Sequence, residues 1–169
     1  MLVFRILHVL GAIAWGGSVF LIVLFIQPTA AAVGPAGAPF MREMLYTRRL
    51  TDWILRLGGI TVVAGAFLYW HDVQLYDGLG DFLASAFGLW LTIGAVAALV
   101  ALGIGGFATK PTIAKGFEVG AKVAQAGAQP PPELVQELQA LQARGRMLAT
   151  WNLLFIGIAA FAMSTARYW

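Results

Sequence analysis

Four long apolar stretches alternate with shorter polar segments along the chain, at residues 2–27, 51–70, 86–108 and 148–166. A helix needs roughly 20 mostly apolar residues to cross the hydrocarbon core of a bilayer, so each stretch is long enough to span it. The first stretch is also longer than the core of a signal peptide, roughly 7–15 residues, and is therefore expected to remain as a span. The pattern predicts four transmembrane helices.

Composition agrees with this interpretation. Hydrophobic residues make up 60% of the 169 positions and charged residues 11%, whereas charged residues are about a quarter of an average soluble domain. A soluble globule and a disordered chain are therefore excluded, and the absence of cysteine excludes a disulfide scaffold. We expect one all-α membrane domain, a four-helix bundle over residues 1–169.

Two of the connecting loops have helical patterns of their own. Residues 39–50 mix apolar and basic side chains at helical spacing, which predicts an amphipathic interfacial helix before the second span. The third loop predicts a helix over residues 113–126, a break at the prolines 130–132, and a new helix from Glu133 that runs into the fourth span.

Charge predicts the orientation. Nine of the 11 Lys and Arg residues lie in or beside the first and third loops, and Arg5 and Arg167 are the other two. By the positive-inside rule these loops face the cytoplasm and both termini lie on the outer, periplasmic side of a bacterial inner membrane. The basic residues flank apolar runs and form no basic soluble face, so the expected partner is the lipid bilayer and not a nucleic acid.

The two histidines, His8 and His71, are the candidate chemistry. His8 lies inside the first span and His71 at the outer end of the second. An ionisable side chain within a span is costly unless it faces a partner, so it indicates a functional site. Arg5, His8, Ala12 and Trp15 recur at three- and four-residue spacing and share one helix face.

Small residues surround that face, among them Gly11 and Ala12. They leave room either for a flat, bulky group or for another helix to come close. Met163 in the fourth span is expected at nearly the depth of His8. The outer third of the bundle thus collects imidazole, thioether and the two outer arginines.

Haem b suits this set best, because iron accepts imidazole or methionine sulfur as axial ligands. His8 would be one ligand and His71 or Met163 the other, with His71 favoured. Arg5 and Arg167 would pair with the propionates, and Gly11, Ala12 and Trp15 would line the ring.

Other interpretations remain open. His8 could simply hydrogen-bond across the bundle in a cofactor-free accessory subunit. Copper is the second cofactor candidate, since Met1, His8, His71 and Met163 offer the soft sulfur and imidazole ligands that Cu(I) prefers.

Further polar and small residues are assigned to packing. Arg56 and Asn152 lie near the inner ends of their spans, where Arg56 can reach the surface. The row Ala97, Ala101 and Gly105 favours packing within the chain over a homodimer contact, although a homodimer remains possible.

Several short motifs resemble small bacterial membrane proteins of the CopD-like group, which are related to HemJ-type protoporphyrinogen oxidases. They are His8 with Trp15-x-Gly17, the stretch from Met44 through Arg48-Arg49-Leu50, Gly59-x-Thr61 with Gly65-x-x-Leu68, Gly88-x-Trp90-Leu91, and Ala162-Met163-x-x-Ala166-Arg167-Tyr168. The resemblance implies a helical bundle in which His8 is a haem b ligand, or part of a copper path.

One departure from the HemJ pattern bears on activity. HemJ-type proteins carry a lysine shortly after the Trp-Leu of the third span, whereas this chain continues Thr92-Ile93-Gly94 and has no lysine in that span. This argues against protoporphyrinogen oxidation. We expect one-electron transfer through haem, with a redox partner or quinone that the sequence does not identify.

Overall fold

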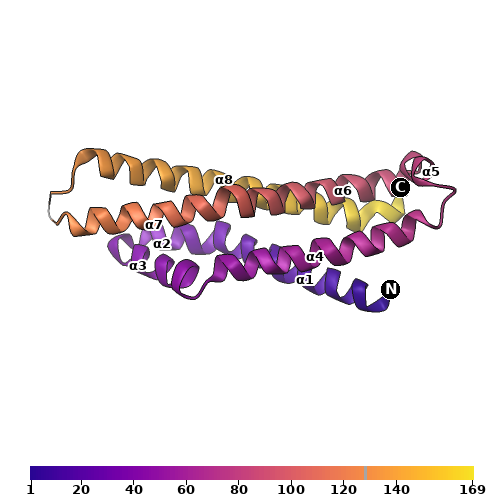
Figure 1. The fold of residues 1–169 in the computed structure, drawn as a ribbon, viewed down its shortest axis with the longest axis horizontal. Coiled ribbons are helices and arrows are strands. Elements are labelled where there is room, and N and C mark those ends of the chain that lie inside the picture. The colour runs from indigo at the N-terminus through magenta and orange to yellow at the C-terminus, as the bar shows by residue number, and fades with distance from the viewer. Residues whose placement is uncertain (128) are drawn as a thin grey trace.

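The computed structural model describes residues 1–127 and 129–169. Within these residues four helical segments are long and apolar enough to cross a membrane, Leu2–Ala32, Leu50–Val73, Ala86–Gln125 and Pro132–Tyr168. They lie lengthwise beside one another, and both chain termini are at the same end (Figure 1). We call this the termini end and the opposite one the loop end. The prediction of an all-helical protein with four helices long and apolar enough to cross a membrane is confirmed for the described residues.

The first and third of these segments are not uniform α-helices. The first consists of α1 (Leu2–Leu21), the π-helical η1 (Ile22–Ile26) and α2 (Gln27–Ala32). The third consists of α6 (Ala86–Gly103), the π-helical η4 (Ile104–Thr109) and α7 (Lys110–Gln125). In each, a proline follows two residues after the π-helical turn, Pro28 in the first and Pro111 in the third.

Neither proline ends its helix, although the sequence pattern placed the ends of the apolar runs there. A proline ring clashes with the carbonyl four residues earlier and offers no N–H to it. A wider π-helical turn just before the proline gives room at that carbonyl, and such turns are found as single insertions within α-helices. The third segment therefore continues through Pro111, and residues 113–126 lie largely in its extension and not in a separate loop helix.

The other two long helices are α4 (Leu50–Val73) and α8 (Pro132–Thr165), which ends in the short η5 (Ala166–Tyr168). α8 begins one residue before the expected start at Glu133 and runs unbroken to the termini end. Short helices fill the connections: η2 (Gly34–Ala36), α3 (Gly37–Arg42), η3 (Glu43–Thr47) and α5 (Leu79–Ala84).

The bundle core is made mostly of small side chains. Trp15 and Val19 of α1 meet Ala97, Ala98 and Ala101 of α6 and Ala159 of α8 in one buried cluster. Alanine lets helix backbones approach closely, which favours packing inside a membrane. Ala97 and Ala101 of the expected packing row are thus buried within the chain.

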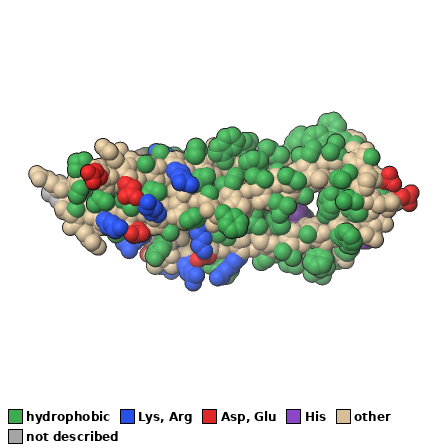
Figure 2. All heavy atoms as spheres, turned by 45° about the horizontal axis from the view of Figure 1, so that its top comes forward, with side chains coloured by type: hydrophobic (Ala, Val, Ile, Leu, Met, Phe, Trp, Pro, Cys, Tyr) green, Lys and Arg blue, Asp and Glu red, His purple; other side chains and the backbone are tan. Residues whose placement is uncertain are grey.

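Charged and apolar side chains occupy different parts of the surface. Lys and Arg side chains gather toward one end of the molecule, and hydrophobic side chains cover most of the rest (Figure 2). Two ion pairs join helices near the loop end: Lys110 of α7 bonds Asp52 of α4 at 2.7 Å, and Lys115 bonds Glu137 of α8 at 2.8 Å. This distribution is that of a membrane bundle with one basic end.

Candidate functional site

His8 lies in the contact between α1 and α4, partly buried. Its Nδ1 is 2.8 Å from the backbone carbonyl oxygen of Thr61 in α4. The imidazole packs flat against the backbone at Gly65, where an added Cβ would lie 2.8 Å from both Nδ1 and Cε1 of the ring. Only glycine at position 65 leaves space for the His8 ring, so the sequence of α4 allows the histidine to pack against the helix backbone.

The hydrogen bond fixes the tautomer of the neutral ring. A carbonyl oxygen only accepts, so Nδ1 must carry the proton and donate it. Nε2 then keeps its lone pair, and in the part of the chain that the structure describes it makes no hydrogen bond. Metal-binding histidines commonly donate their second N–H to a carbonyl in this way, which orients the ring and strengthens the ligand nitrogen.

The rest of the His8 face is closed by α4. A Cβ added at Gly11 would lie 2.5 Å from Thr61 Oγ1, and one added at Gly58 would lie 2.9 Å from the Trp15 indole. Trp15 is 4% exposed. Of the two uses proposed for the small residues, the close approach of another helix is the one observed at Gly11. A porphyrin ring at His8 must therefore lie beside this contact and not within it.

An aromatic pair lies in the same contact between α1 and α4, one helical turn from His8 along α1. Phe4 of α1 and Phe67 of α4 stack with ring centroids 4.5 Å apart. Ala12, one turn from His8, is half-buried. The edge of the contact near His8 is thus apolar.

Neither expected second ligand lies against the His8 ring. His71 is exposed and lies six residues beyond Gly65 on α4, which is about 9 Å along the axis and about 120° around it. Met163 instead packs between α8 and α6, where a Cβ at Gly94 would lie 2.7 Å from its Cγ. The structure brings His8 together with Gly65 and Thr61, but with neither His71 nor Met163.

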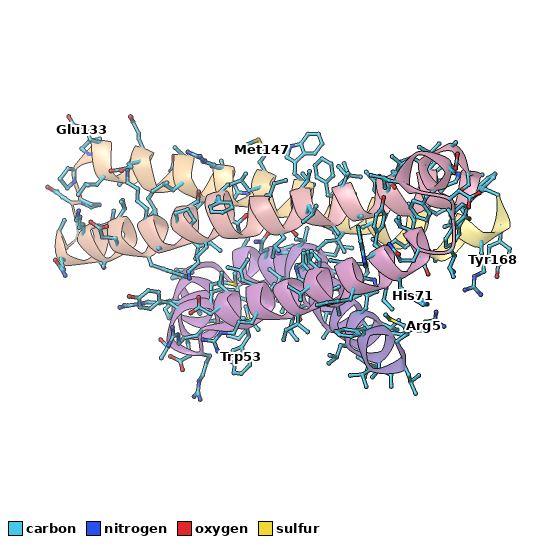
Figure 3. All side chains as sticks on the ribbon, turned by 45° about the vertical axis from the view of Figure 1, so that its right-hand side comes forward. Arg5, Trp53, His71, Glu133, Met147 and Tyr168 are labelled. Carbon is cyan, nitrogen blue, oxygen red and sulfur yellow. The ribbon has the colours of Figure 1, made fainter. Side chains whose placement is uncertain are left out.

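The two arginines expected to pair with propionates are at the termini end. Arg5, His71 and Tyr168 all lie toward that end (Figure 3), and Arg167 belongs to η5. Both are exposed, and among the described residues neither takes part in an ion pair. Their guanidinium groups are available to an anionic group at this surface.

A wider apolar groove lies elsewhere. It has a volume of about 480 Å³ and opens between Phe20 of α1, Trp90 of α6 and Gly157 of α8. His8 is not among its lining residues, so the groove offers apolar space without an axial ligand. Trp90 also stacks on Trp169 with centroids 5.4 Å apart, which holds the C-terminal end of the chain against α6.

The donor set therefore fits haem in part. It supplies one oriented imidazole and two exposed arginines, and no second axial ligand is in place. For copper the fit is poorer, because His8 and Met163 lie in different helix contacts. The described part of the chain holds no group of three or more His, Cys, Asp or Glu side chains placed to bind a metal ion.

Comparisons with family models, with curated proteins and with solved structures find no match to this chain. The likeness to CopD-like and HemJ-type proteins thus rests on the short motifs alone.

Asn152, which the sequence assigned to packing near the inner end of the fourth span, is buried between helices. It is 6% exposed, and its Nδ2 donates to the Ala101 carbonyl of α6 at 2.8 Å. The sequence did not identify this partner. Arg56, in contrast, is exposed as expected and lies over the Trp53 ring, 5.1 Å from its centroid.

Proposed function

We propose that this chain is a haem b-binding protein of the bacterial inner membrane that takes part in one-electron transfer near the outer face. The observation that carries the proposal is the His8–Thr61 hydrogen bond, since it orients the imidazole and leaves Nε2 as a free ligand. When bound, haem supplies an iron centre that accepts and releases one electron.

The chain's own residues have separate tasks in this proposal. His8 Nε2 would bind the haem iron, with the ring held by the Thr61 carbonyl and by the glycine surface at Gly65. Arg5 and Arg167 neutralise the propionates, which belong at a polar surface. His71 remains the favoured second ligand over Met163, because imidazole is the stronger donor and a buried methionine more often fills space.

The proposed orientation places His8 in the outer half of the membrane. Most Lys and Arg residues lie toward the loop end, which the positive-inside rule assigns to the cytoplasm. Both termini, His71 and the two proposed propionate arginines then lie on the periplasmic side. The redox partner or quinone would meet the haem from that side.

In the third span, where HemJ-type proteins carry a lysine shortly after the Trp-Leu motif, this chain has Thr92 in a polar contact with Tyr69. The Tyr69 hydroxyl and the Thr92 hydroxyl are 2.8 Å apart, and Thr92 also donates to the Gly88 carbonyl at 2.6 Å. This neutral pair joins α4 to α6 and supplies no cation in the span. The proposal is therefore electron transfer and not protoporphyrinogen oxidation.

The direct test is the haem content of purified protein. The wild-type protein should show a Soret band and sharp reduced bands, and His8→Ala should lose them while still inserting into the membrane. A colourless wild-type protein, or full haem occupancy in His8→Ala, would contradict the proposal.

A second variant tests the orientation of the ring while keeping the ligand. Gly65→Ala places a methyl group where the imidazole now lies, whereas Gly59→Ala, on the same helix, meets nothing within 4 Å. Disturbing the support of a metal-bound histidine typically costs about 10–100-fold in affinity, so Gly65→Ala should bind haem at least about tenfold more weakly. Gly59→Ala should bind it as the wild type does. Equal affinity in the two variants would rule out the observed His8 orientation as the ligand geometry.

A further inference from the structure

A small, partly open cavity lies between all four long helices, toward the loop end. Its volume is about 70 Å³, and its walls include Trp15 and Val19 of α1, Ile54 of α4, Ala101 of α6 and Ala149 of α8. Four uncharged polar side chains also line it: Gln27, Thr51, Thr109 and Asn152. The cavity lies on the loop-end side of His8 and shares Trp15 with the His8 contact.

Two polar atoms at this cavity have no partner among the described residues. They are Asn152 Oδ1 and Thr109 Oγ1, and both are buried. The amide is held in place because Nδ2 donates to the Ala101 carbonyl, so Oδ1 cannot exchange roles with it. An unsatisfied buried acceptor is destabilising, and such atoms in native proteins are usually paired with protein or with ordered water.

The backbone around the cavity is irregular on two of its sides. Ile22 and Val23 of the π-helical η1 line it, as do Gly105 and Thr109 of the π-helical η4. π-helical turns are often found at functional sites. Within a membrane, irregular backbone is tolerated where it is buried in protein or borders a water-filled cavity.

Size and charge select the occupant. A water needs roughly 10–15 Å³ of such space, so the cavity is large enough to hold water. No charged side chain lines the cavity, so a cation would be desolvated without a counter-charge. An apolar occupant would leave both polar atoms unsatisfied, whereas water can donate to Asn152 Oδ1 and accept from the Thr109 hydroxyl.

We propose that this cavity is a hydration site in which bound water hydrogen-bonds Asn152 Oδ1 and Thr109 Oγ1. The water links α8 to the π-helical turn of the third segment. The proposed hydrogen bonds use none of His8, Thr61 and Gly65, so loss of haem would not remove them.

The sign of a stability change tests the proposal. Thr109→Val removes the hydroxyl at nearly constant volume. If water is bound, the variant loses a hydrogen-bonded partner and its Tm should fall, by about 2–4 °C for a chain of this size. If the cavity is dry, removing an unsatisfied hydroxyl should raise the Tm, and a rise would overturn the proposal.

Thr112→Val is the matched control. Thr112 lies almost one turn further along the same helix, is 7% exposed, and already donates to the Ala108 carbonyl at 2.7 Å. Thr112→Val removes only an ordinary hydrogen bond within the helix. We therefore expect it to lower the Tm by less than Thr109→Val does. An equal or larger fall at Thr112 would show that the effect is not specific to the cavity.

A direct observation completes the test. The protein in lipid nanodiscs, at a resolution that shows ordered water, should have density within hydrogen-bonding distance of Asn152 Oδ1, and Thr109→Val should weaken it. A dry cavity binds xenon, whereas a hydrated one resists it. Xenon in this cavity, with no water density, would overturn the proposal.

Discussion

At the scale of single residues, the α1–α4 contact depends on glycines that receive larger side chains from the partner helix. Gly58 receives Trp15, Gly65 receives His8, and Gly11 receives the Thr61 hydroxyl. The pairs alternate between helices, so each backbone approaches the other closely. This explains how a histidine and a tryptophan fit between two helices without forcing them apart.

Gly11→Ala should destabilise this contact. The new methyl group would lie 2.5 Å from Thr61 Oγ1, and that hydroxyl is tied to the Leu57 carbonyl by a 2.8 Å hydrogen bond. Overpacking of this kind lowers the free energy of unfolding by about 1–3 kcal/mol. Unfolding in mixed micelles measures it, and Gly17→Ala on the same helix is the control.

Nothing lies within 4 Å of a Cβ added at Gly17, so Gly17→Ala creates no steric clash. The higher helix propensity of alanine is then its main effect on stability. It should leave stability unchanged or raise it by up to about 1 kcal/mol. If Gly11→Ala is as stable as Gly17→Ala, α1 and α4 are not in the close contact described.

Sequence periodicity predicted which residues share a face but not what covers it. It grouped His8 with Trp15 correctly as neighbours on one side of α1, because helical spacing alone fixes that relation. Whether a cofactor or a helix lies opposite depends on a residue 53 positions away in sequence, Thr61. The same limit applies to the partner of Asn152, because a backbone carbonyl on another helix leaves no side-chain pattern in the sequence.

At the scale of elements, the start of α4 is set by one unusual backbone conformation. Arg49 has φ of 55° and ψ of 33°, in the left-handed region, between η3 and α4. The reversal lets the chain turn from the short helices into the second span. The Arg49 side chain forms an ion pair with Asp52 at 3.0 Å. Ion pairs on an exposed surface contribute little to the free energy of unfolding.

Arg49→Gly should therefore be tolerated better than Arg48→Gly. The left-handed conformation costs a non-glycine residue about 1–2 kcal/mol, and glycine avoids that cost. Arg48 has φ of −79°, where glycine brings only its extra conformational freedom in the unfolded chain. The two variants, each losing one exposed ion pair, should differ by about 1 kcal/mol in unfolding free energy. Equal stability would show that Arg49 does not need this conformation.

Helix lengths show where sequence reading is reliable for elements. The four apolar runs identified four long helices because their length and hydropathy leave few alternatives. The sequence wrongly indicated that helices end at Pro28 and Pro111. In the structure a π-helical turn precedes each proline and the helix continues past it. A proline predicts a disturbance in the helix, and whether the helix ends there depends on its neighbours.

At the scale of the whole molecule, the third and fourth helical segments, of 40 and 37 residues, are the longest of the four. α8 has 34 residues, about 51 Å at 1.5 Å per residue, against a hydrocarbon core of about 30 Å. α7 and the first half of α8 form a helical hairpin at the loop end (Figure 1), and Val119 of α7 is buried, at 2% exposure. The Lys115–Glu137 ion pair joins the two helices in this region.

The proposed orientation places this hairpin in the cytoplasm, and the absence of cysteine makes that testable with single labels. Glu133→Cys lies at the far end of the hairpin, and Asp77→Cys lies in the connection at the termini end; both positions are exposed. In intact cells whose outer membrane has been made permeable, a membrane-impermeant maleimide should label Asp77→Cys at once. It should label Glu133→Cys only after the inner membrane is opened. The reverse order would overturn the positive-inside assignment and would move His8, His71 and both proposed propionate arginines to the cytoplasmic half of the bundle.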